Sequence, residues 1–367
     1  MSLGISYDHG RKECSALLLV NLGTPAAPTT SAVRRYLAQF LSDRRVIDLP
    51  RWMWWPILHL IILRFRPARS ARAYRKIWTE EGSPLMLHTR ALSEALAERL
   101  RQDGWSQLQV AFAMTYGEPS IPQVIGQLRE RGVRRIAVLP MYPQYSATTT
   151  AAVNDQVMDT VRDWAHAPQL RLLDAYHDHP AWLDAVAASI QRHWDQRGRA
   201  DRLLFSFHGI PRRYFLNGDP YHCQCMASAR RIAERLQLGA EDYQVSFQSR
   251  VGREEWLRPY TDQTLESWGK QGVQRVQVVC PGFAVDCLET LEEIAMENAQ
   301  LFKSAGGRDL EYIPALNADP AHAAALAEVA QSLLAGWADA DPDAAELSAR
   351  RERAQRMAVD SPNGPKA

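Results

Sequence analysis

The sequence lacks an apolar run long enough to cross a membrane. Its most apolar stretch, residues 52–63 (WMWWPILHLIIL), has 12 residues and contains Pro56, whereas a bilayer-spanning helix needs about 20. Residues 16–20 form a second apolar run, which is shorter than a signal-peptide core and leads directly into a turn. We therefore expect no signal peptide, no membrane span and a cytoplasmic location.

The chain also lacks an excess of charge of either sign. Its 43 basic side chains nearly balance 42 acidic ones, which leaves a net charge of +1. Because affinity for a phosphate backbone normally comes from a basic excess, this balance argues against a nucleic-acid partner. The sequence has no glycine-rich loop of the dinucleotide-binding or Walker type, so a nucleotide site is not expected either.

Cysteine is scarce as well. Five cysteines in 367 residues are too few for a disulfide framework, and an odd number leaves one unpaired, which favours a reducing compartment. Cys223 and Cys225 are one residue too close for the usual C-x-x-C chelate, and no partner pair follows them. The thiols are therefore interpreted as structural.

What the chain does contain is a regular alternation of short apolar runs and amphipathic helical segments. Continuous apolar runs are typical of parallel strands that helices cover on both faces, so the alternation indicates an α/β protein with doubly wound sheets. Strands are predicted at residues 15–21, 107–114, 134–140, 169–174, 202–207, 243–248, 274–280 and 309–313. Helices are predicted at residues 84–103, 119–131, 148–165, 179–197, 221–237, 260–271, 286–304 and 319–336.

The predicted strands divide into two sets of four, which suggests two α/β domains. The first would span residues 14–174, with an apolar lip at 50–66, and the second would span 175–308. Residues 309–337 would add a strand and a helix that pack back on the domains. Residues 338–367, rich in charged and small side chains, are expected to form a disordered tail.

One histidine stands directly after a predicted strand. His208 follows the apolar residues 203–207 and precedes Gly209 and Pro211. Open α/β sheets bind ligands at the carboxyl ends of their strands, and a neutral imidazole can take a proton or bind a metal. A structural histidine in a turn is the alternative, and the residues alone leave both interpretations open.

Acidic residues recur after another predicted strand. Asp286, Glu289, Glu293 and Glu297 are spaced by three, four and four residues, which places them on one helix face. The sequence contains no lysine or arginine between Asp286 and Gln300. Such a row of carboxylates suits a divalent cation or a proton relay; a solvated helix face is the alternative.

Aromatic and aliphatic residues gather in the segment 50–66, which we call the lip. Trp52, Trp54 and Trp55 stand beside a run of leucines and isoleucines, and arginines flank the run on both sides. An exposed apolar lip suits a membrane surface or a large flat apolar ligand, and a buried core helix is the alternative.

Several blocks of the chain resemble the ferrochelatase family and follow its order from about residue 16 to about residue 320. The resemblance implies two Rossmann-like domains with parallel sheets around a central porphyrin cleft. It also implies a metal chelatase of the lyase class, which inserts Fe(II) into protoporphyrin IX and releases two protons in the last step of haem biosynthesis. The blocks are LLLVNLGTP, EGSPL, LPMYPQYSATTT, LLFSFHGIP, GDPY, SFQSRVGREEWLRPYT and PGFAVDCLETLEEI.

The resemblance also assigns roles to residues. His208 is similar to the cleft histidine that binds metal or takes a pyrrole proton, and Glu289 to the carboxylate that faces it, so both are candidate catalytic and metal-binding residues. Asp286 and Glu293 are similar to acidic neighbours in a proton relay. The porphyrin-binding candidates are Leu22, Arg66, Tyr74, Ser83, Tyr116, Trp256 and Phe283.

The chain departs from parts of the family in two places, and these departures narrow the expected cofactor and porphyrin substrate. Members with a [2Fe–2S] cluster carry a cysteine in the YPQYS block and three more near the C-terminus, whereas this chain has Ala147 and no cysteine after Cys287. We therefore expect no cluster and no tightly bound cofactor, with Fe(II) as a substrate. Members that act on coproporphyrin carry a tyrosine where this chain has Leu22, which favours protoporphyrin.

Other interpretations remain open at this point. They are a coproporphyrin ferrochelatase, a cobaltochelatase, and a two-lobed protein that binds a metal or tetrapyrrole without chemistry. Peripheral contact with a membrane is expected through the lip, and the oligomeric state is left open.

Overall fold

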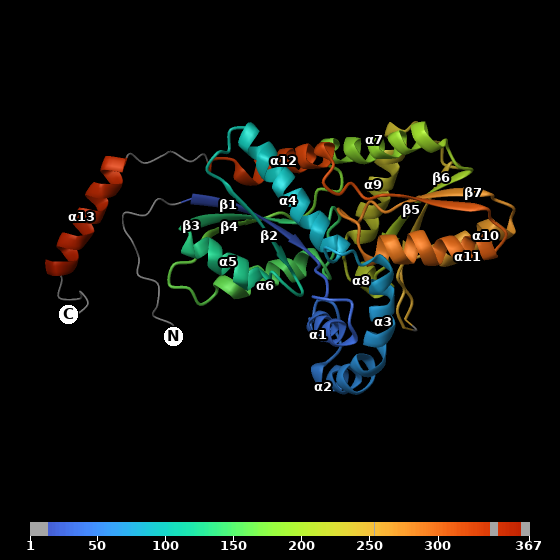
Figure 1. Cartoon of the computed structure of the whole chain (residues 1–367), viewed down its shortest axis with the longest axis horizontal. Helices are drawn as coiled ribbons and strands as arrows, with labels where there is room; N and C mark the ends of the chain where they lie inside the picture. Colours follow the sequence, from blue (N-terminus) through green and yellow to red (C-terminus); the bar gives the residue numbers. More distant parts are fainter. Residues whose placement is uncertain (1–13, 253, 338–343, 361–367) are drawn as a thin grey trace.

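The computed structural model describes residues 14–252, 254–337 and 344–360 and contains two parallel four-stranded sheets (Figure 1). The first, in the order β2-β1-β3-β4, consists of β1 (Cys14–Asn21), β2 (Gln109–Met114), β3 (Val133–Pro140) and β4 (Gln169–Leu172). The second, in the order β6-β5-β7-β8, consists of β5 (Arg202–His208), β6 (Tyr243–Gln248), β7 (Arg275–Val279) and β8 (Asp309–Ile313). Both sheets have the same strand order, and the predicted doubly wound α/β fold is confirmed.

Side chains of the central strand β1 alternate between two apolar cores. Leu17 and Leu19 pack with α4 (Pro84–Gln102) on one face of the sheet. Leu18 packs on the other face with α5 (Ile121–Glu130) and α6 (Thr150–Val161). Because both faces are covered, β1 appears in the sequence as a continuous apolar run rather than an alternating one.

The second sheet is covered in the same way. Phe205 and Phe207 of β5 pack with α7 (Pro180–Arg197) and α9 (Tyr221–Arg235). Leu204 points to the opposite face, toward α10 (Thr261–Lys270) and α11 (Ala299–Ser304).

The last helix of the second half crosses to the first sheet. β8 is the edge strand beside β7, and α12 (Pro320–Leu334) then packs against α4, β3 and α7. Leu326 of α12 therefore shares one continuous core with Leu17 of the first sheet and Phe205 of the second. This shared core fixes the two sheets relative to each other.

The C-terminal segment differs from the sequence prediction. Residues 344–360 form the helix α13 (Ala344–Asp360), which lies apart from the rest of the chain in Figure 1, whereas a disordered tail was expected. Alanine, glutamate and arginine are strong helix formers, and Glu346 pairs with Arg350 one turn later at 2.5 Å. The remainder of the predicted tail, 338–343 and 361–367, lies outside the described residues.

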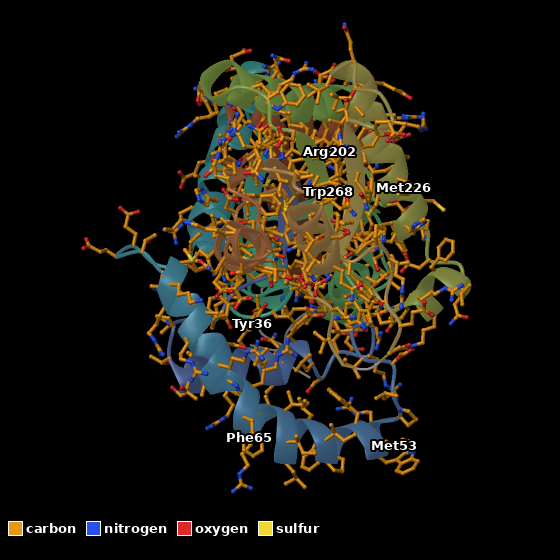
Figure 2. All side chains as sticks on the ribbon, turned by 90° about the vertical axis from the view of Figure 1, so that its right-hand side faces the viewer. Tyr36, Met53, Phe65, Arg202, Met226 and Trp268 are labelled. Atoms are coloured by element: carbon orange, nitrogen blue, oxygen red, sulfur yellow. The ribbon has the colours of Figure 1, made fainter. Side chains whose placement is uncertain are left out.

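The lip is a helical projection from the first domain. α1 (Thr30–Phe40) leads to α2 (Arg51–Pro56), the π-helix η1 (Ile57–Ile62) and α3 (Leu63–Ile77). Figure 2 shows Met53 and Phe65 at the outer edge of this projection, with Tyr36 nearer the body. The remaining two elements, which belong to the second half, are α8 (Arg212–Leu216) and the π-helix η2 (Glu289–Asn298).

The lip exposes most of its apolar side chains. Trp52 is 78% exposed, Leu60 is 63% exposed and Phe65 is 71% exposed, whereas Leu58 is buried against the first domain. The half-buried Trp54 donates its indole N–H to the carbonyl oxygen of Leu41 at 2.6 Å. The prediction of an exposed apolar surface, as opposed to a core helix, is therefore confirmed. Among the described helices, none is both long enough and apolar enough to cross a membrane.

One buried histidine gives the fold a specific pH dependence. His322 at the start of α12 is fully buried, and its Nδ1 lies 2.7 Å from the carbonyl oxygen of Asn317. Burial lowers the pKa of His322 to about 4. Because the unfolded chain takes up this proton near pH 6.5, stability is full above that pH and falls as the pH drops toward 4.

We predict that His322→Gln removes this component of the acid sensitivity. For the original chain, the component amounts to at most roughly 3 kcal/mol of unfolding free energy between about pH 6.5 and 4. Urea unfolding of both proteins at pH 7 and pH 4.5 measures it. Equal losses of unfolding free energy in the two proteins would show that His322 does not titrate as described.

Candidate active site

Three of the predicted site residues lie at or after the carboxyl ends of central strands. In each sheet, the first and third strands in chain order lie side by side. From the first strand the chain continues to one edge of the sheet, and from the third strand it continues to the other edge. This switch point is where open α/β sheets bind ligands. Leu22 follows β1, His208 ends β5, and Glu289 begins η2 after the loop that follows β7.

One ring nitrogen of His208 makes a hydrogen bond to the backbone. Its Nδ1 lies 2.7 Å from the carbonyl oxygen of Gly209. Since a carbonyl oxygen only accepts, Nδ1 carries the hydrogen, and Nε2 of the neutral ring has the lone pair. The half-buried ring has the aromatic rings of Trp256 and Phe283 at centroid distances of 6.4 and 6.5 Å.

The turn after His208 requires glycine. A Cβ atom on Gly209 would lie 2.9 Å from the carbonyl oxygen of Gln248 and 3.1 Å from the Trp256 ring. The missing side chain therefore lets β6 and Trp256 approach the backbone beside the imidazole.

Glu293 is the acidic residue most firmly held beside His208. Ser249 donates to its carboxylate twice, from the backbone N–H at 2.7 Å and from the hydroxyl at 2.5 Å. Burial nevertheless raises the pKa of Glu293, and the neighbouring Glu289 raises it further, while Ser249 and His208 oppose the shift. Glu293 therefore holds a proton at a higher pH than a solvated glutamate does.

Glu289 faces the first domain. Burial raises the pKa of Tyr36, Tyr74 and Tyr142, and the nearby charge of Glu289 adds to each increase. Arg66 of α3 is close enough for Glu289 to stabilise its charge, although burial lowers the pKa of that guanidinium. The Glu289 carboxylate therefore lies where the two domains meet.

The carboxylate row is carried by a π-helix rather than the expected α-helix. In η2, two side-chain amides donate to backbone carbonyl oxygens: Gln248 to that of Glu289 at 2.9 Å, and Asn298 to that of Glu293 at 2.8 Å. π-Helical turns are rare and are frequently found at functional sites. These amides supply donors to carbonyl groups of the two residues that bear the key carboxylates.

Asp286 anchors the start of this segment. Its buried carboxylate accepts from the Tyr312 hydroxyl at 2.6 Å, the Asn317 amide at 2.7 Å and the Thr290 hydroxyl at 3.0 Å. These bonds connect Asp286 to β8, to the segment after it and to η2. A part for Asp286 in proton transfer stays a prediction.

The predicted porphyrin-binding residues occupy two kinds of position. Leu22, Arg66, Trp256 and Phe283 are half-buried. Tyr74, Ser83 and Tyr116 are buried; Ser83 accepts from the Thr24 hydroxyl at 2.8 Å and Tyr116 donates to Asp43 at 2.8 Å.

Three features of the site were not assigned from the sequence. Gln248 and Ser249, which contact η2, lie within the quoted block SFQSRVG, but nothing in the sequence assigned them to the carboxylates. Tyr142 likewise lies in the LPMYPQYSATTT block, and burial raises the pKa of its phenol while the nearby Glu289 charge adds to the increase. Their position at or just after the end of a predicted strand is the sequence signal that could have identified all three residues.

Two further observations concern cavities and metal clusters. A cavity of about 630 Å³ lies elsewhere, between β6 and α10, and is lined by Gln244, Tyr260 and Trp268 among others. Within the part of the chain that the structure describes, no cluster of three or more histidine, cysteine or acidic side chains is arranged to hold a metal ion. His208 and Glu289 are thus a pair of candidate ligands, not a closed metal cage.

Known proteins resemble this chain over nearly its whole length. The ferrochelatase of Nitrosococcus oceani is 49% identical over 357 residues, which cover 96% of this chain and 97% of the relative. The ferrochelatase of Janthinobacterium sp. (strain Marseille) is 50% identical over 360 residues, covering 96% and 98%. Among solved structures, SirB from Bacillus subtilis with Fe3+ matches with a TM-score of 0.48 at 11% identity, covering 88% of this chain and 97% of that one.

The family assignment follows from these matches. The sequence model named Ferrochelatase matches residues 14–334, which include both sheets and every site residue described above. The chain belongs to the ferrochelatase family, and the protein is a metal chelatase of haem biosynthesis that acts on a porphyrin and ferrous iron.

Proposed function

We propose that this protein is a protoporphyrin ferrochelatase of the lyase class, which inserts Fe(II) into protoporphyrin IX. The observation that carries the proposal is that His208 ends β5 and Glu289 begins η2 after the loop that follows β7, at the edge where α/β sheets bind ligands, and that His208 acts electrostatically on Glu293. Aromatic rings stand beside this imidazole, and they provide the apolar wall that a flat macrocycle requires.

The reaction needs a base and an exit for protons. Two N–H protons leave the pyrrole nitrogens as Fe(II) enters, and a neutral imidazole accepts a proton near neutral pH. His208 therefore binds the metal or takes a pyrrole proton through Nε2. Glu289 acts with His208 as a metal ligand or proton acceptor, and Glu293 receives protons because burial raises its pKa.

Leu22 supports protoporphyrin as the porphyrin. It is half-buried after β1 and packs in the same apolar cluster as Leu288, which precedes Glu289. An aliphatic side chain at this position suits the apolar vinyl edge of protoporphyrin better than the additional carboxylates of coproporphyrin.

We predict that His208→Ala and Glu289→Gln each lower turnover by about 10²–10⁴-fold, the usual contribution of a general acid or base. Porphyrin binding should persist, because apolar walls provide most of the affinity. The measurement is anaerobic Fe(II) insertion followed by the absorbance change of metalation, with protoporphyrin, coproporphyrin and a cobalt substrate in parallel.

Exposed residues of the same types serve as controls for these variants. His166→Ala and Glu328→Gln change an exposed histidine and an exposed glutamate outside the site, and both should retain full activity. Near-normal turnover by a folded His208→Ala or Glu289→Gln protein would remove that residue from the mechanism. If coproporphyrin were metalated faster than protoporphyrin, or cobalt were inserted faster than Fe(II), the proposed substrate would be wrong.

We also propose that the lip makes peripheral contact with a membrane in an otherwise cytoplasmic protein. Inserting the exposed rings of Trp52 and Trp55 would contribute several kcal/mol, at about 25 cal/mol per Å² of buried apolar surface. Flanking arginines would each add about 1 kcal/mol near anionic lipid. The lip would then guide an apolar porphyrin or haem between membrane and cleft.

The lip prediction is that Trp52→Ser with Trp55→Ser weakens flotation with anionic liposomes at least tenfold, while porphyrin metalation in detergent is retained. Trp54 is left intact because its indole bonds to Leu41. Leu216→Ser is the matched control, since Leu216 is 65% exposed but lies on α8 outside the lip. Unchanged flotation of the double variant would contradict membrane contact.

Finally, we propose that the protein holds no iron–sulfur cluster. A cluster needs converging thiolates, whereas no three histidine, cysteine or acidic side chains of the described residues converge on one point, and burial raises the pKa of the Cys225, Cys280 and Cys287 thiols. Protein purified without air should therefore contain no stoichiometric acid-labile sulfide. Sulfide and iron in equal, stoichiometric amounts would overturn this prediction.

A further inference from the structure

An ion pair joins α3, the helix that begins in the lip, to the π-helix η2. Lys76, in the last turn of α3, places its Nζ 2.5 Å from Oε1 of Glu292 in η2. The Glu292 side chain is only 6% exposed, whereas that of Lys76 is 49% exposed. This bond reaches across the domain boundary to the helix that carries Glu289 and Glu293.

The burial of Glu292 distinguishes this pair from an ordinary surface salt bridge. Exposed ion pairs contribute little because water screens both charges. A carboxylate that is almost completely buried is costly unless a cation compensates it, and η2 contains no lysine or arginine of its own. Removing the ammonium group would therefore leave the Glu292 carboxylate without its cation, and the cost favours a displacement of η2 that brings water to Glu292.

Such a movement would displace the site. Glu292 adjoins Glu293 in the chain and lies three residues after Glu289 in the same π-helix. Gln248 of β6 holds η2 from within the second domain, while Lys76 holds it from the first. Since α3 begins in the lip, the same bond connects the position of the lip to the position of the carboxylates.

We propose that Lys76, paired with Glu292, is a positioning residue that holds Glu289 and Glu293 in place for metalation. The inference rests on the proposed function of the site. Lys76 acts through Glu292 and contacts neither porphyrin nor metal. Its loss should therefore affect the use of Fe(II) more than the binding of porphyrin.

The test is a double-mutant cycle of Lys76→Met and Glu292→Gln. Lys76→Met keeps an apolar stem and should lower kcat/KM for Fe(II) by on the order of tenfold, with KM for protoporphyrin changed less than twofold. Adding Glu292→Gln should restore much of the loss, because no uncompensated charge then remains buried. Lys76→Arg should also retain activity, since it keeps the cation.

Controls separate the possible outcomes. Arg45→Met breaks the more exposed pair with Asp155 and should leave kcat/KM unchanged. Additive effects in the cycle, or a loss of melting temperature in Lys76→Met without a change in kcat/KM, would overturn the positioning role. If the original chain itself fails to metalate protoporphyrin, the proposed function fails instead, and the two failures are distinct.

Discussion

Everything at the site depends on holding carboxylates out of water beside an imidazole. Glu293 is half-buried and burial raises its pKa, and the fold compensates its carboxylate with two donors from Ser249 and with the nearby His208. Glu292 is compensated by Lys76 from the other domain. Without these partners, the cost of burying charge would move η2 toward solvent, and the proton acceptors would leave the cleft.

The two halves provide a frame rigid enough to meet this requirement. Each half brings the ends of its central strands to a switch point, and α12 joins both halves through a continuous apolar core. A core of this kind resists small displacements, so the end of β1 and the end of β5 keep their separation. The exposed lip is instead held by fewer contacts, among them the Trp54 bond to Leu41.

Much of this arrangement could be predicted from the sequence, for identifiable reasons. Strands buried on both faces are continuous apolar runs, so β3 and β5 were located to within a residue or two, and the strand-end rule with the family blocks selected His208 and Glu289. The π-helix could not be predicted, because a spacing of four residues suits both helix types. Lys76 and Glu292 are 216 residues apart, and no local pattern relates them. The charged composition of residues 344–360 suggested disorder, although the same residues favour a helix.

The central claim is that porphyrin binds beside His208 and Glu289 at the ends of the second sheet's strands, with Leu22 of the first domain facing it. A crystal structure of the protein with bound protoporphyrin IX tests it most directly. The account predicts a macrocycle with Leu22 against one face and its pyrrole nitrogens within reach of His208 Nε2, with η2 retaining its π-helical turns. A macrocycle bound in the cavity between β6 and α10, or with His208 turned away from its nitrogens, would contradict the account.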